Sequence, residues 1–140
     1  MPMGNLFIRW DDEVNQTGLA ILDEQHRGLV TMINSFYFHK NDPFIERILV
    51  PTALMTINFA KIHFITEQEL MAEAQYPELD EHIKVHEHLY RELVRVELKS
   101  RRARDADGLL AFLKTWWLEH VNEYDRRYVP HLIDYFGNKD

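Results

Sequence analysis

The sequence predicts an all-α fold, an antiparallel up-down-up-down four-helix bundle preceded by an irregular N-terminal arm. Apolar residues recur at intervals of three and four, which is the helical period, and Val, Ile and Thr show no period-2 alternation. Only five glycines and five prolines interrupt the 140 residues, so the segments between breaks are long. Because 46% of the residues are apolar, the chain can fill one core, and we expect a single domain over residues 1–140.

The arm is expected over residues 1–18, with Ile8 and Trp10 attaching it to the bundle. The bundle should span residues 19–130, followed by a C-terminal tail over residues 131–140. The predicted helices run over about Leu19–Phe38, up to about Gln75, over about Pro77–Arg102, and from an N-cap at Asp105 or Asp107 to Pro130. The first residue of the second helix is left undecided, because Pro51 either kinks that helix or begins its regular part.

Composition excludes several classes of function. The formal net charge of −7 argues against a nucleic-acid surface, and the short basic run 99–104 is interpreted as a solvated helix end. The absence of cysteine excludes disulfides and thiolate metal sites, so a transition metal must be held by His and carboxylate. No apolar run approaches a transmembrane helix and the N-terminus does not resemble a signal peptide, so we expect a soluble cytoplasmic protein without a membrane partner.

Histidines occupy positions where a core is expected. Each of the four predicted helices carries at least one histidine on its apolar stripe, and these are His26, His63, His82, His86 and His120. A lone histidine on such a stripe is usually a hydrogen-bonded core residue. Five of them around one bundle axis need partners for many buried ring nitrogens, and a shared metal supplies those partners. His39, His88 and His131 fall off the stripes and are assigned to the surface.

The spacing of two pairs agrees with a metal site. His63 and Glu67 are four residues apart, as are His82 and His86, so each pair lies on one helix face and can chelate a metal. Glu67 would otherwise be an unpaired buried charge. Without a cation, Glu67 and Asp125 should repel each other, and their pKa values should rise.

The third spacing is less regular. His120 and Asp125 are five apart, or about 140° around an α-helix, so that periodicity alone does not place Asp125 at the site. A long reach or a local distortion of the helix is needed. The Glu-x-x-His pairs of ferritin-like bundles and the His-Glu-x-x-His motif of zinc proteases are both absent. Five imidazoles and two carboxylates exceed the four ligands of structural zinc and suit two iron ions with bridging carboxylates.

The sequence resembles the hemerythrin family, specifically its single-domain bacterial members. The ordered set His, HxxxE, HxxxH, HxxxxD carries the resemblance. It lies in the segments GLAILDEQHRGL, HFITEQELM, YPELDEHIKVH and WWLEHVNEYDRRY, which together touch all four predicted helices. The resemblance also assigns Asp125 to the site, which periodicity does not.

The resemblance implies a role for each ligand. Glu67 and Asp125 would bridge two iron ions that share a bridging oxo or hydroxo group. The imidazoles of His82, His86 and His120 would complete one iron, and those of His26 and His63 would hold the other, leaving an open position. Dioxygen would bind there reversibly, and small anions such as azide would bind at the same position.

One departure from the family pattern concerns the oxygen pocket, which Trp117 and Val121 are expected to line. The family usually has Trp-Leu at four and three residues before the last histidine, and this chain has Trp116-Trp117. Because no acid is apparent near the site besides the ligands, we expect oxygen binding for storage, delivery or sensing, without enzymatic activity. The alternative is a di-iron enzyme that turns over peroxide or nitric oxide at the same centre.

Overall fold

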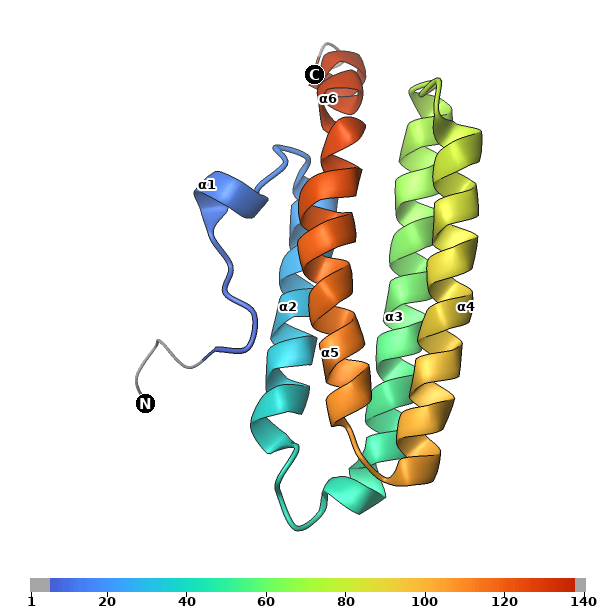
Figure 1. Cartoon of the computed structure of the whole chain (residues 1–140). Helices are drawn as coiled ribbons and strands as arrows, with labels where there is room; N and C mark the ends of the chain where they lie inside the picture. Colours follow the sequence, from blue (N-terminus) through green and yellow to red (C-terminus); the bar gives the residue numbers. More distant parts are fainter. Residues whose placement is uncertain (1–5, 138–140) are drawn as a thin grey trace.

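Four long helices form the bundle, and their order around it follows the chain. The structure is a computed structural model that describes residues 6–137 (Figure 1). The helices are α2 (Ala20–His39), α3 (Ile45–Glu73), α4 (Leu79–Ala103) and α5 (Asp107–Thr115), the last continued by η2 (Trp116–Tyr124) and η3 (Asp125–Arg127). Neighbours in the chain pack on each other, and α2 also packs on α5, which closes the bundle. The predicted all-helical bundle is confirmed.

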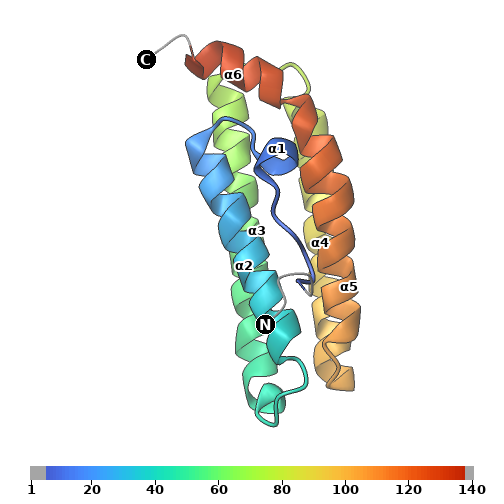
Figure 2. The ribbon, with the colours of Figure 1, turned by 90° about the vertical axis from the view of Figure 1, so that its left-hand side faces the viewer.

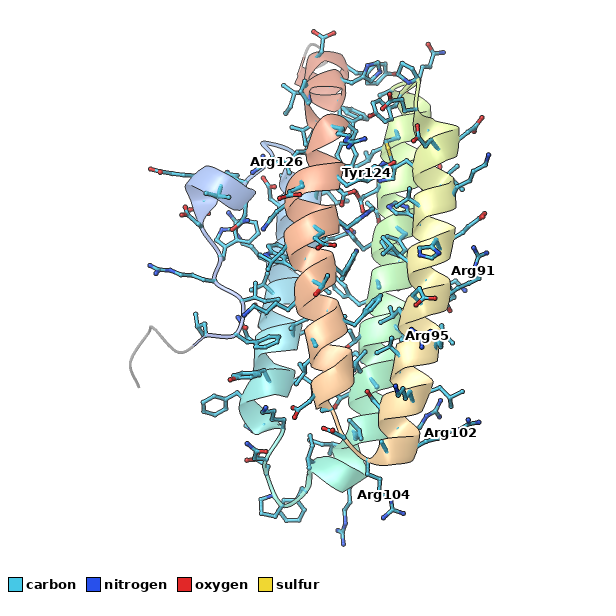
Figure 3. The ribbon with its side chains drawn as sticks, in the orientation of Figure 1. Arg91, Arg95, Arg102, Arg104, Tyr124 and Arg126 are labelled. Carbon is cyan, nitrogen blue, oxygen red and sulfur yellow. The ribbon has the colours of Figure 1, made fainter. Side chains whose placement is uncertain are left out.

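The structure locates two helix starts, and the second differs from the prediction. Pro51 lies within the N-terminal part of α3, so it does not begin that helix. The N-cap of α5 is Ala106, which makes no side-chain cap hydrogen bond. Asp105 nevertheless accepts a hydrogen bond from the Asp107 amide at 3.0 Å, and so still satisfies one free N–H at the helix start. At the C-terminal end of α4, Arg102 and Arg104 are exposed and project outward, as expected of a solvated helix end (Figure 3).

The expected tail after Pro130 is wrong for residues 131–137, and residues 138–140 lie outside the described part of the chain. A further helix, α6 (Val129–Gly137), begins there and turns across the end of the bundle (Figure 2). Pro130 is in its first turn, where a missing N–H costs no hydrogen bond. The buried side chain of Leu132 and a hydrogen bond from Tyr135 to Glu73 at 2.9 Å hold α6 on the end of α3.

Residues 6–18, the described part of the N-terminal arm, lie along the bundle between α2 and α5 (Figure 2). It includes one short helix, α1 (Asp12–Asn15). As predicted, Ile8 is buried and Trp10 packs against the core. The Ile8 backbone also exchanges two hydrogen bonds of 2.7 Å with the Asn34 side chain. The arm is therefore part of the folded domain and covers one side of it.

Gly18 makes the corner between the arm and α2 possible. Its φ of 89° is in the left-handed region, where a side chain is strained. The buried carboxylate of Asp23 accepts hydrogen bonds from the Thr17 and Gly18 amides at 2.8 and 3.2 Å. These contacts hold the corner and set where α2 begins, ahead of His26.

Candidate metal centre

All seven predicted ligands meet in the interior of the bundle. His26 lies on α2, His63 and Glu67 on α3, His82 and His86 on α4, His120 on η2 and Asp125 on η3. None of these side chains is more than 5% exposed. The structure thus brings together every residue that the sequence analysis assigned to the site, from all four sides of the bundle.

The ligand atoms form two groups. One comprises His82, His86, His120 and Asp125, and the other His26, His63 and Asp125; within each, one atom per residue lies within 4.8 Å of the others. In the first group, the Nε2 atoms of His82 and His120 each lie 3.0 Å from Oδ1 of Asp125. In the second, the Nε2 atoms of His26 and His63 are 3.1 Å apart. The two groups differ by one imidazole.

These contacts have the spacing of metal ligands. An octahedral ion with bonds of about 2.1 Å holds neighbouring ligand atoms about 3.0 Å apart. The Nε2 atoms of His82 and His120 are that close to Oδ1 of Asp125, yet the geometry is not that of a hydrogen bond. The buried atoms that lack a hydrogen-bond partner include Oε1 of Glu67, the Nε2 atoms of His82, His86 and His120, and both carboxylate oxygens of Asp125.

Such a concentration of unpartnered buried polar atoms is costly in a protein without a cation. They belong to the residue types that bind iron, and they converge from different helices. The residues present therefore fit a metal centre, with His, Asp and Glu as its ligands.

The two carboxylates lie between the groups. Asp125 belongs to both. Oε1 of Glu67 lies 2.8 Å from Nε2 of His63 in one group and 3.8 Å from Nε2 of His86 in the other. Both carboxylates are thus close to imidazoles of both groups.

A π-helix explains how Asp125 reaches the site. Hydrogen bonds in η2 span five residues, and the Asp125 N–H donates to the carbonyl of His120. A pair five residues apart is thereby brought to one helix face, which an α-helix would not do. The local distortion that the sequence required is this π-helix, and it occurs at the ligand pair itself.

Three further residues support the ligands, and the sequence analysis missed them. Oε1 of Gln25 lies 2.9 Å from Nδ1 of His63, and the side-chain amide of Gln68 lies 2.9 Å from Nδ1 of His86. When Nδ1–H donates to a glutamine oxygen, as it can to Gln25, the ring is fixed and Nε2 is free for a metal. At His86 the same arrangement requires the side-chain amide of Gln68 to turn its oxygen toward Nδ1. Tyr128, fully buried, donates to Oε2 of Glu67 at 2.7 Å. Burial and the adjacent carboxylates raise the pKa of Tyr128 well above its usual value, so its hydroxyl stays protonated.

The pKa values of both carboxylates lie below those of free side chains, whereas the expected rise on loss of the metal compares two states of the protein and stays a prediction. Burial and Asp125 both raise the pKa of Glu67, but the adjacent His63 lowers it, and the net direction is downward. Burial likewise raises the pKa of Asp125, but His120 and His82 bring it to about 2. The surrounding imidazoles, which the simple repulsion argument left out, decide both directions.

Burial also acts on the imidazoles. It lowers the pKa of His26 to about 3 and that of His86 to about 3. Burial opposes the charge of His63 too, but the carboxylate of Glu67 raises the pKa of that imidazole. At neutral pH, His26 and His86 are therefore neutral and can offer a lone pair to a metal.

The residues expected to line the oxygen pocket are both buried, and Trp117 lies beside a ligand. The ring of Trp117 is 5.9 Å from that of His26, nearly perpendicular to it at 85°, and 6.0 Å from that of Trp10 in the arm. Val121 is buried on the same helix, η2. Trp117 thus packs on the group with two imidazoles. On the other side, Phe64 stacks on His86 with ring centroids 4.1 Å apart.

The remaining histidines lie outside both groups. His39 is exposed and lies 2.6 Å from Asp42, and His88 is exposed on α4. His131 is only half-buried, and its Nε2 lies 2.6 Å from the carbonyl of Ala74 at the end of α3. His131 is therefore a contact between α6 and α3 and not a purely surface residue.

The fold and the site define a class, helical-bundle proteins that bind metal through histidine and carboxylate. The chain belongs to the hemerythrin family, since the model of the hemerythrin HHE cation binding domain matches residues 17–132.

Relatives of this family align with most of the chain. A bacteriohemerythrin of Stenotrophomonas maltophilia (strain R551-3) is 30% identical over 125 residues, which cover 88% of this chain and 80% of that protein. A myohemerythrin of Riftia pachyptila is 27% identical over 88% of this chain and 92% of its own. The crystal structure of a hemerythrin point mutant superposes with a TM-score of 0.78 at 21% identity, over 91% of this chain and 98% of that chain, which supports the fold.

Proposed function

We propose that this chain binds dioxygen reversibly at a centre of two iron ions with a bridging oxo or hydroxo group. The observation that carries the proposal is the inequality of the two ligand groups, three imidazoles against two, with Asp125 common to both. An ion held by fewer protein ligands keeps a position for an external ligand. The names of the relatives, bacteriohemerythrin and myohemerythrin, agree with this function.

The iron pair, when bound, supplies the site for dioxygen and the electrons that its binding requires. The chain supplies the geometry. Gln25 orients the imidazole of His63 through Nδ1, and the buried rings of His26 and His63 converge through Nε2. Trp117 and Val121 are buried and apolar, so they exclude water from this side of the centre.

Binding without turnover is favoured by the state of Tyr128. Its hydroxyl donates to Glu67 and its pKa is raised, so it holds a carboxylate in place and does not supply a proton to a bound substrate. A di-iron enzyme that consumes peroxide or nitric oxide is the alternative function. We expect a cytoplasmic role in storage, delivery or sensing of oxygen.

A spectroscopic experiment separates binding from turnover. The iron-loaded protein is reduced without air, oxygen is admitted, and the visible spectrum is recorded before and after flushing with argon. Reversible binding predicts an absorption band that appears with oxygen and disappears under argon over several cycles. Continuous consumption of added reductant would instead support the enzyme.

A further inference from the structure

The outer face of α3 is unusually apolar for an exposed helix. Six large side chains recur along it at intervals of one, three, four, six and seven residues, and each is between 40% and 64% exposed. They are Phe44, at the N-cap of the helix, and Ile48, Leu54, Met55, Ile62 and Ile65. Contrary to the expectation that no apolar run approaches a transmembrane helix, the segment Arg47–Glu73 is long and apolar enough to cross a membrane by length and composition, as the core helix of a bundle also can be. We call these six side chains the α3 stripe.

The area of the α3 stripe is that of an interface. Six side chains about half exposed, at about 200 Å² for a fully exposed large side chain, present roughly 600 Å². This equals the upper end of the largest apolar patches on monomeric proteins, about 300–600 Å². It is also most of the roughly 800 Å² that each partner buries in a standard protein–protein interface.

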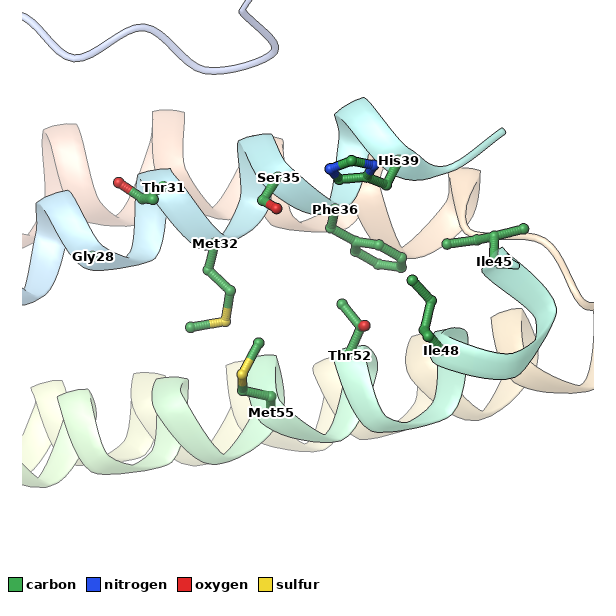
Figure 4. Close-up of a pocket in the computed structure, with 10 residues that line it drawn as sticks. All are labelled: Gly28, Thr31, Met32, Ser35, Phe36, His39, Ile45, Ile48, Thr52 and Met55. Carbon is green, nitrogen blue, oxygen red and sulfur yellow. The ribbon is translucent and has the colours of Figure 1, made fainter. Parts of the chain in front are cut away.

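The stripe borders a groove that can receive side chains. A cavity of about 370 Å³ lies between α2 and α3, where Met32 faces Met55 and, farther along, Phe36 faces Ile48 (Figure 4). Thr52 also lines it. The groove therefore occupies the N-terminal half of the stripe, whereas the protruding Ile62 and Ile65 occupy the C-terminal half.

The stripe is complementary to itself when two copies of α3 run antiparallel and cross at Asn58. In that register, each residue meets the one equally far on the other side of Asn58. Leu54 then lies level with Ile62 of the second copy, and Pro51 with Ile65. The groove of one copy is thus level with the protruding isoleucines of the other.

Charge and polarity favour the same register. Arg47 and Glu69 are both exposed and form no ion pair with another described residue. In the antiparallel crossing each lies level with the other on the second copy, which gives two symmetric ion pairs at the rim. Asn58, an exposed amide within the apolar stripe, meets itself on the two-fold axis, and a buried amide pair fixes register in helical interfaces.

We propose that the α3 stripe is the interface of a two-fold symmetric dimer of this chain, with two α3 helices crossing antiparallel at Asn58. The ligands on α3, His63 and Glu67, face the bundle interior, so that the dimer leaves the metal centre intact. The partner is a second copy because the same surface, turned antiparallel, provides apolar side chains for the stripe, isoleucines for the groove and an opposite charge for Arg47 and for Glu69.

Sedimentation equilibrium of the iron-loaded full chain tests the dimer. The mass should rise with concentration from 16.8 kDa toward twice that value. Ile62→Glu should give a monomer at every concentration. The control is Leu118→Glu. Leu118 is exposed on η2, which continues α5, the helix diagonally opposite α3 in the bundle. The control should dimerise as the parent does.

Charge reversal tests the register. Arg47→Glu or Glu69→Arg alone should raise the dimer Kd by about tenfold or more, because each places like charges opposite each other twice. The double variant should restore the parent Kd, and the effect should weaken in high salt. If single and double variants dimerise equally well, the antiparallel register is wrong.

Cross-linking tests the crossing point, and the absence of cysteine in the chain makes the result unambiguous. Helix axes about 8–10 Å apart place facing Cα atoms at about 3.4–5.4 Å, which overlaps the range of about 4.4–6.8 Å in a disulfide. Asn58→Cys should therefore form a covalent dimer under mild oxidation, and Leu118→Cys should not. A monomer at all concentrations overturns the proposal. The proposal is also overturned if the chain is a monomer that binds anionic phospholipid vesicles and if Ile62→Glu abolishes that binding, since the stripe would then be a membrane-binding surface.

Discussion

Trp117→Leu removes the indole that packs against the two-imidazole side of the centre. The side chain is 1% exposed, and its ring contacts those of His26 and Trp10 at 5.9 and 6.0 Å. Leucine is the residue that the family pattern usually has at this position. The substitution therefore opens space between the N-terminal arm and the imidazole of His26 without changing any ligand.

Two effects should follow, and they have different sizes. The cavity should lower the free energy of unfolding by about 1–3 kcal/mol, less than a Trp-to-Ala change, because Trp10 can move partly into the space. For a domain of this size, each kcal/mol lowers Tm by about 3–5 °C. Access of anions to the centre should improve by about tenfold, which corresponds to a barrier lowered by about 1.4 kcal/mol.

Stopped-flow mixing of the ferric protein with azide measures access, and oxidation of the ferrous protein in air measures protection from water. Both rates should increase in Trp117→Leu. Trp116→Leu is the matched control, because Trp116 is also buried but packs on Phe64, with ring centroids 5.7 Å apart. It should lose similar stability with unchanged azide binding.

Two results would refute this reasoning. Unchanged azide and oxidation rates in Trp117→Leu, with an ordinary loss of stability, would leave the indole as core packing only. Equal acceleration in both variants would mean that any cavity in this region loosens the bundle, and that Trp117 has no special position.

Three further predictions follow from the site. His86→Ala should reduce iron affinity by at least about 10–100-fold, which is the loss typical when a residue that hydrogen-bonds to a metal ligand is changed. His88→Ala, at an exposed position, should bind iron as the parent does, and an equal loss in both variants would mean that the inward face of α4 is misassigned. Tyr128→Phe should lower the free energy of unfolding by about 1–3 kcal/mol and weaken iron retention against a chelator, since Glu67 loses its hydrogen bond; unchanged retention would limit Tyr128 to packing. Burial lowers the pKa values of His26 and His86 to about 3, so from pH 6.5 downward the unfolded chain gains protons at these two imidazoles that the folded metal-free chain does not. The stability of the metal-free chain should therefore fall between pH 7 and 5, by about 2 kcal/mol for each of the two imidazoles, and a flat denaturation midpoint over that range would contradict the assignment.

Regular α-helical spacing made most of the site predictable. His63 with Glu67, and His82 with His86, are four residues apart and lie on one face, as the period requires. Asp125 could not be placed this way, because a π-helix depends on backbone hydrogen bonds that no residue pattern in the sequence specifies. The resemblance to the family supplied that ligand.

The residues missed are those whose role depends on a neighbour in space. Tyr128 contacts Glu67 across 61 positions of sequence, and Gln25 contacts His63 across 38. The only available signal was their position beside a ligand, Gln25 directly before His26 and Tyr128 one turn after Asp125. The helix after Pro130 was missed because proline was interpreted as an end, although it is equally suited to a first turn.

The measurement that tests the central claim most directly is the amount of dioxygen taken up and released per iron. The reduced, iron-loaded protein is equilibrated with a known amount of oxygen, then flushed with argon, and iron is quantified in the same sample. The proposed function predicts about two irons per chain, about one dioxygen per iron pair, and recovery of that dioxygen as gas. One metal ion per chain, or oxygen that is consumed and never recovered, would contradict it.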